Sequence, residues 1–169
     1  MTDNIINRVA NSSLKTIDLE DLYPSEKRTV IDIKPWLFNK FILKEKDFRN
    51  SLKNYNWAQY KNQYIALTCS TNAIIPSWAY MLIATYLTPF AKKIVVGNLH
   101  ELETAIFQDI LNNFNYKAYQ NLPVIIKGCA NKPIPETAYI QLIKNLQPIA
   151  KSIMFGEACS SVPLFKATK

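Results

Sequence analysis

Short apolar runs alternate with segments of helical periodicity along most of the chain. The runs at residues 64–67 and 124–126 are each followed by a polar loop containing proline, then by an apolar helix and a second short run that ends in glycine. Short runs separated by helices are typical of parallel strands joined by right-handed crossovers. The pattern therefore predicts an α/β fold in which a duplicated strand–helix–strand unit forms a mostly parallel sheet with flanking helices.

The duplication is also visible in the residues themselves. Residues 76–98 and 135–157 align without a gap, and nine of the 23 positions are identical, where average residue usage predicts roughly one or two. Further back, a one-residue gap brings Cys69 opposite Cys129. The identical positions are Pro76, Ala79, Tyr80, Leu87, Pro89, Ala91, Lys92, Ile94 and Gly97, which match Pro135, Ala138, Tyr139, Leu146, Pro148, Ala150, Lys151, Ile153 and Gly156.

The rest of the chain completes one predicted domain. Residues 99–114 have the spacing of an amphipathic helix, with Asn98 as the N-cap and Glu101 three residues later. Before the repeats, residues 15–19 and 28–33 favour strands, residues 23–26 favour a turn, and a helix is predicted to begin near Lys44. The single domain then consists of an N-terminal β/α extension (1–62), a first repeat (63–98), a linking helix (99–118) and a second repeat (122–159).

Composition narrows the class of protein. Residues 70–91 carry no charge, but their strongly apolar centre at 78–87 is about half the ~20 residues of a membrane-spanning helix, so we expect a buried core helix and no membrane partner. The net charge of +7 comes from scattered lysines, which does not predict specific binding of nucleic acid. The N-terminus lacks the pattern of a secretory signal, and the three cysteines cannot all pair within the chain. We therefore expect a cytoplasmic protein with reduced thiols.

The cysteines mark the candidate site. Cys69 and Cys129 follow the first strand of each repeat, and in the same register His100 falls opposite Cys159. All four follow the carboxyl ends of predicted strands, where open α/β sheets place their ligand crevices. Three cysteines and a histidine match tetrahedral zinc, and the same residues could hold an iron–sulfur cluster. Glu101, Glu157 or a water molecule is an alternative fourth ligand.

Other interpretations stay open. A free cysteine also packs as a small hydrophobic residue, and a reactive thiol could carry sulfur as a persulfide without any metal. A non-catalytic interaction module, with a basic surface that docks an acidic partner, is a third hypothesis, and a homodimer is possible. With only three glycines the chain contains neither G-x-G-x-x-G nor a Walker loop, so no nucleotide cofactor is expected. The sequence does not decide whether the protein is an enzyme.

Several segments also resemble a known family. They are NRVANS, IDLEDLYP, ILKEKDFR, YIALTCS, WAYMLIA, VIIKGC and GEACSSVPLFK. Together they resemble an uncharacterised family of Bacteroidetes proteins, the domain of unknown function DUF2480, over nearly the whole chain. The resemblance implies a gene neighbourhood with the sulfur-mobilisation genes of iron–sulfur assembly. It favours a role for Cys69, Cys129 and Cys159 in handling iron–sulfur clusters or sulfur, with iron–sulfur assembly proteins as partners.

Overall fold

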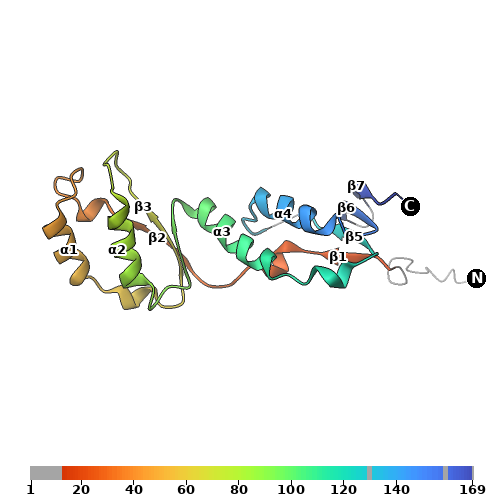
Figure 1. The fold of residues 1–169 in the computed structure, drawn as a ribbon, viewed down its shortest axis with the longest axis horizontal. Coiled ribbons are helices and arrows are strands. Elements are labelled where there is room, and N and C mark those ends of the chain that lie inside the picture. The colour runs from red at the N-terminus through yellow and green to blue at the C-terminus, as the bar shows by residue number, and fades with distance from the viewer. Residues whose placement is uncertain (1–12, 129–130, 158–159, 169) are drawn as a thin grey trace, which may run out of the picture. The chain divides into compact units, whose positions relative to one another are not determined.

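The described residues of the chain form two compact units. The computed structural model describes residues 13–128, 131–157 and 160–168 (Figure 1). One unit, here called the inserted unit, comprises residues 24–106, and the other, the split unit, comprises residues 1–23 and 107–169. The prediction of a single domain stays a prediction, because the division does not show whether the units fold independently.

The inserted unit is built on a three-stranded parallel sheet. Its strands lie in the order β2-β3-β4, with Arg28 opposite Tyr64 and Tyr64 opposite Lys93. Helix α3 (Leu99–Asn112) begins in this unit and ends in the split unit. The other elements of the inserted unit are β2 (Arg28–Asp32), the 3-10 helix Lys34–Trp36, α1 (Glu45–Lys53), the 3-10 helix Trp57–Tyr60, β3 (Tyr64–Thr68), α2 (Ser77–Leu87) and β4 (Lys93–Val96).

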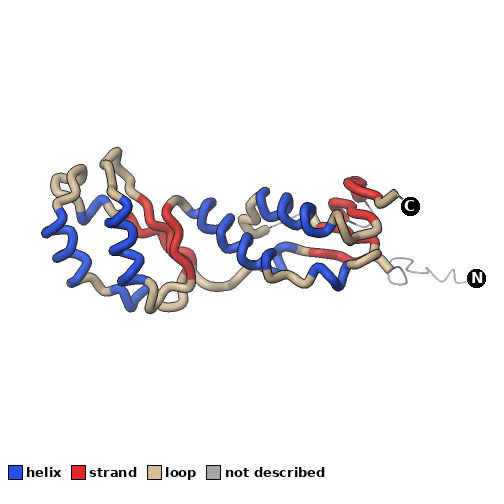
Figure 2. Tube along the Cα trace, in the orientation of Figure 1, coloured by secondary structure: helices blue, strands red, loops and turns tan. Residues whose placement is uncertain are grey.

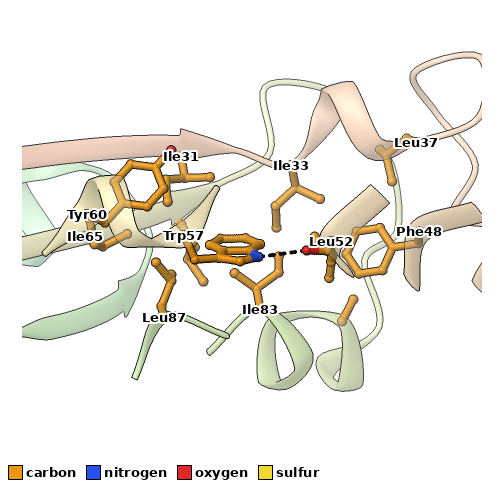
Figure 3. Close-up of a cluster of buried hydrophobic side chains, with 12 residues drawn as sticks. Ile31, Ile33, Leu37, Phe48, Leu52, Trp57, Tyr60, Ile65, Ile83 and Leu87 are labelled. Atoms are coloured by element: carbon orange, nitrogen blue, oxygen red, sulfur yellow. Dashed lines mark hydrogen bonds between the residues drawn. The ribbon is translucent and has the colours of Figure 1, made fainter. Parts of the chain in front are cut away.

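Side chains from α1, α2 and this sheet form one hydrophobic cluster (Figure 3). Phe48 and Leu52 of α1 and Ile83 of α2 are fully buried in it. The Trp57 indole lies among them, and its Nε1–H donates to the Leu52 carbonyl over 2.8 Å. Burying each such apolar side chain contributes about 1.5–3 kcal/mol to the stability of the inserted unit.

The split unit contains a four-stranded sheet in the order β1-β5-β6-β7. β1, β5 and β6 are parallel, and β7 is antiparallel to β6. A second hydrophobic cluster joins this sheet to α4 and to Phe107 and Leu111 of α3. The elements are β1 (Lys15–Ile17), the 3-10 helix Leu19–Leu22, the 3-10 helix Tyr116–Tyr119, β5 (Pro123–Ile126), α4 (Glu136–Leu146), β6 (Ser152–Glu157) and β7 (Ser160–Lys166).

The two units repeat the same spacing of elements. The first strand, the helix and the second strand of the repeated unit begin at Tyr64, Ser77 and Lys93 in the inserted unit, and 59 residues later in each case in the split unit. Asn62 and Asn121, also 59 apart, both have positive φ, at 60° and 58°. This constant spacing supports the predicted duplicated unit. It also makes Gly128, rather than Cys129, the counterpart of Cys69.

The α/β fold with mostly parallel strand pairing is confirmed, but three details differ from the sequence analysis. The strands divide between two sheets, because β1 pairs with β5 and β2 pairs with β3. Residues 160–166, which lie beyond the predicted second repeat and for which no strand is predicted, form β7 along the free edge of β6. The segment at 23–26 is irregular with a bend at Glu26 rather than a turn. As expected, residues 77–87 form a helix that packs on the core, and no helix in the described part of the chain is long and apolar enough to cross a membrane.

Candidate functional site

Each sheet presents an aspartate at the carboxyl end of its first strand, because Asp18 directly follows β1 and Asp32 is the last residue of β2. Ile17 pairs with Ile126 of β5, and Ile31 pairs with Leu67 of β3. The two partners, Leu67 and Ile126, are 59 residues apart and therefore occupy equivalent positions in the repeat. Asp18 and Asp32 follow these two isoleucines and therefore occupy equivalent places at the carboxyl ends of parallel strands. This edge is where ligand crevices form in open α/β sheets.

In the inserted unit, Asp32 fastens the connection that follows β3. Its Oδ1 accepts hydrogen bonds from the backbone N–H groups of Lys34 and Ser70, both over 3.0 Å. The Ser70 hydroxyl donates to Oδ2 over 2.5 Å. Burial opposes ionisation of this carboxyl, but the hydrogen bonds outweigh it and lower the pKa of Asp32 below its ordinary value. Asp32 is thus a structural anchor for the residue next to Cys69.

In the split unit, the three parallel strands end in charged residues. Lys127, just after β5, donates from Nζ to Asp18 Oδ2 over 2.9 Å, and the Glu20 N–H donates to Asp18 Oδ1 over 2.9 Å. The hydrogen bond from Lys127 lowers the pKa of Asp18, and the same bond raises the pKa of Lys127, with Glu157 at the end of β6 adding to the second effect. Asp18, Lys127 and Glu157 therefore interact at one edge of the sheet.

Glu20 holds the backbone at Asn131 and Lys132, between β5 and α4. Its Oε1 accepts hydrogen bonds from the backbone N–H groups of Asn131 and Lys132, the second over 2.9 Å. The Lys132 ammonium also lies 5.7 Å from the centre of the Tyr23 ring, within the range of a cation–π contact. These contacts fix Asn131 and Lys132 beside the segment that follows β1.

Cys69 directly follows β3 and is half-buried. It packs against the hydrophobic cluster of the inserted unit. Burial and the neighbouring Cys69 raise the pKa of Tyr80, which packs against the same cluster. These surroundings are what the packing interpretation of Cys69 predicts, and its role as a metal ligand stays a prediction.

His100 is exposed in the first turn of α3. Its backbone N–H donates to the Asn98 side chain over 2.8 Å, and the Glu101 N–H donates to the same oxygen over 3.2 Å. In return, Glu101 Oε2 accepts from the Asn98 N–H over 2.6 Å. This reciprocal cap confirms the predicted start of the helix. Gly97 is required before it, because φ is 143° and a Cβ there would collide with the Glu101 carboxylate.

Cys129 and Cys159 lie outside the described residues, but their described neighbours are placed. Gly128 precedes the first gap, and a Cβ at Gly128 would lie 2.8 Å from the Phe155 ring of β6. Glu157 and Ser160 flank the second gap and are paired across the β6–β7 hairpin. Gly128 and Glu157 therefore lie at the same edge of the split unit's sheet, at the carboxyl ends of neighbouring parallel strands.

The four predicted ligands fall in two pairs along the chain. Cys69 and His100 belong to the inserted unit, whereas positions 129 and 159 belong to the split unit. Among residues 13–128, 131–157 and 160–168, no three His, Cys, Asp or Glu side chains are close enough together to hold a metal ion. Convergence of the four predicted ligands, with zinc or an iron–sulfur cluster between them, stays a prediction.

The sequence analysis missed the two aspartates, although the chain carries a signal for them. The triplets Ile17–Asp18–Leu19 and Ile31–Asp32–Ile33 repeat within a short distance. In each, two buried apolar residues flank the aspartate. An acidic residue between two core positions at the end of a strand indicates a carboxylate held at the sheet edge.

The fold and these strand-end groups define an α/β protein with two mainly parallel sheets, each carrying charged and polar groups at the carboxyl ends of its strands. The chain belongs to the family described as protein of unknown function (DUF2480), which matches residues 3–167 and so nearly its whole length. No curated protein and no solved structure shows significant similarity to it.

Proposed function

We propose that this protein binds zinc or an iron–sulfur cluster through cysteine thiolates at the strand ends, and that it assists iron–sulfur cluster assembly in the cytoplasm. The residues proposed to take part are Cys69, Cys129, Cys159 and His100. The family resemblance supports this role through the genomic context that it implies.

The observation that carries the proposal is the position of the connections that bear Cys129 and Cys159. They leave the carboxyl ends of β5 and β6, which are neighbouring parallel strands. Adjacent strands lie about 4.8 Å apart, which suits two ligands of one metal centre. The contact of Gly128 with the Phe155 ring and the hold of Glu20 on Asn131 and Lys132 keep the described ends of these segments in place. Cys129 and Cys159 are therefore the first pair to test.

Thiolates fit the proposed ligands by their chemistry. Soft sulfur ligands select zinc or iron–sulfur clusters over magnesium or calcium, and a metal ion binds cysteine only after the thiol has lost its proton.

The test is metal content and the ultraviolet–visible spectrum of protein purified without oxygen and without an affinity-tag metal. We expect near-stoichiometric zinc, or iron and sulfide with a visible charge-transfer band. Replacing Cys129 or Cys159 with serine should abolish retention of the metal. Metal-free protein with three titratable thiols would overturn the proposal and direct attention to persulfide chemistry.

The variants Cys69→Ser and His100→Gln test the two proposed ligands of the inserted unit. Loss of metal in both would place all four residues in one centre. Retention in both would restrict the centre to Cys129 and Cys159 with ligands from the split unit, such as Glu157. Unchanged metal content in Cys129→Ser and Cys159→Ser would show that the proposed ligands are wrong.

A further inference from the structure

An open apolar groove lies at one edge of the inserted unit. It has a volume of about 650 Å³ and lies between the connection from β2 to α1 and the connection from β3 to α2. Both connections leave the carboxyl ends of neighbouring parallel strands; the first contains the 3-10 helix Lys34–Trp36, and the second is drawn as a loop in Figure 2. The lining residues are Phe41, Ile42, Leu43, Glu45, Asn72, Ala73, Ile74, Pro76 and Trp78. All belong to the inserted unit.

The side chains at the rim of this groove are unusually exposed for their type. Ile74 is 92% exposed, Phe41 60% and Ile42 55%. Scattered single apolar residues are ordinary on a surface. These three instead line the same hollow, and clustered apolar exposure of this kind marks a binding surface.

Positive charge flanks the groove. The Lys44 ammonium lies 3.2 Å from the centre of the Phe38 ring, and the Arg49 guanidinium lies 5.5 Å from the centre of the Trp78 ring in the groove wall. Residues 34–49 contain five cationic and two acidic side chains, and one of the acids, Glu45, is bonded to Arg49 over 2.8 Å. Residues 69–76, on the other side, carry no charge. The groove therefore combines an apolar floor with a net positive flank.

We propose that this groove binds a short acidic segment of a partner protein, which inserts one or two apolar side chains between Phe41 and Ile74. The carboxylates of that segment then face Lys44, Arg49 and the neighbouring lysines. A segment with apolar residues on one side and acidic residues on the other matches both features of the surface. The proposal is independent of the metal site, because none of the four proposed ligands lines the groove.

The experiment uses the full chain and three labelled peptides of equal length. The first repeats leucine pairs and glutamate pairs, the second replaces each glutamate with lysine, and the third replaces each leucine with serine. Fluorescence polarisation measures binding. We expect saturable binding of the first peptide alone, weakened by added salt because exposed charges are screened. No saturation by the first peptide up to about 1 mM, a very weak affinity, would overturn the proposal.

Substitutions locate the contact. Ile74→Ser and Phe41→Ser remove exposed side chains and should weaken binding about tenfold, as loss of a central anchor does. Arg49→Gln should weaken binding and reduce its dependence on salt. The matched controls are Met81→Ser and Ile140→Ser, at 68% and 70% exposed, which do not line the groove and should bind as the wild type does. Equal effects of Ile74→Ser and Met81→Ser would contradict the proposal.

Two further measurements test other occupants. Binding to vesicles of phosphatidylcholine and phosphatidylserine that Ile74→Ser abolishes, with no peptide binding, would assign the groove to a lipid surface and overturn the proposal. Sedimentation that shows a dimer in the wild type and a monomer in Ile74→Ser would assign the groove to a second copy of the chain and would also overturn the proposal. An oligomeric state that Ile74→Ser does not change, together with binding of the first peptide, supports the proposal.

Discussion

Arg28 and Glu103 form a buried ion pair that fastens the first turns of α3 to β2. The Arg28 Nε lies 2.6 Å from Glu103 Oε1, and the two side chains are only 11% and 7% exposed. The Arg28 Nη1 also donates to the carbonyls of Pro24 and Glu26, over 2.5 and 2.6 Å. The Arg28 guanidinium therefore bonds both to α3 and to the segment before its own strand, β2.

Removing one member of this pair should cost much more than removing both. Glu103→Ala leaves a buried guanidinium without its carboxylate, and we expect the free energy of unfolding to fall by about 3–5 kcal/mol. The double variant Arg28→Met with Glu103→Leu replaces both charges with apolar side chains and should recover most of that loss. Urea unfolding followed by tryptophan fluorescence measures both. A double variant no more stable than Glu103→Ala would contradict this account.

Tryptophan fluorescence reports on the inserted unit, because all three tryptophans of the chain belong to it. Tyrosine fluorescence and circular dichroism include the split unit as well. The tryptophans are Trp36, Trp57 and Trp78.

Equivalent positions of α2 and α4 should respond alike to truncation. Ile83 and Leu142 are fully buried, whereas Met81 and Ile140 are mostly exposed. Ile83→Ala and Leu142→Ala each leave a cavity and should lower the free energy of unfolding by about 2–5 kcal/mol. Met81→Ala and Ile140→Ala should change it by no more than about 0.5 kcal/mol. Circular dichroism in urea gives the four values, and a large loss in either exposed variant would show that its face is covered in solution.

Asp32 should make the inserted unit sensitive to acid. Its pKa in the folded chain lies below the ordinary value of 3.8, so the ionised carboxyl stabilises the fold at pH values above 3.8. That contribution is lost as the pH falls below 3.8 and through the lower folded-state pKa. We expect wild-type protein to lose more stability than Asp32→Asn between about pH 7 and pH 3, measured by urea unfolding with tryptophan fluorescence. Equal losses would remove Asp32 as the cause.

Glu20 should matter for metal retention if the proposed function is correct. Glu20→Ala frees the backbone of Asn131 and Lys132 and so loosens the segment after Cys129. Loss of a residue that orients metal ligands typically lowers affinity about 10–100-fold, which competition with a chelator would measure. The control is Glu26→Ala, which removes a surface carboxylate bonded to Lys92 in the inserted unit. Similar metal loss from both variants would mean that the effect of Glu20 is not local.

Local elements were predictable because their determinants are local. The helix starts after Pro76 and Pro135, the cap formed by Asn98 and Glu101, and the helix after Lys44 follow from neighbouring residues and are confirmed. Strand partners depend on contacts far apart in the sequence, and the apolar runs at 15–19 and 28–33 look alike until β1 is placed against β5. The strand at 160–166 was missed because its exposed residues do not show a buried face.

The candidate site was predictable only in part. The strand ends were identified through their cysteines, yet the groups that the structure fixes there are Asp18, Asp32 and Glu20. Their importance comes from hydrogen bonds to residues that are distant in the sequence, such as Lys127 and Ser70. The apolar groove was missed for the same reason, since Phe41 and Ile74 become neighbours only when β2 and β3 pair.

The pairing of Lys15 with Val124 has a consequence for the newborn protein on the ribosome. The first strand of the split unit leaves the exit tunnel early, whereas its partner is synthesised only after the whole inserted unit. At about 5–20 residues per second, that delay lasts roughly 5 to 20 seconds. The inserted unit, whose strands are consecutive, can close its own sheet during this interval. We therefore expect the sheet of the inserted unit to form first during translation, and β1 to stay unpaired until β5 has been synthesised.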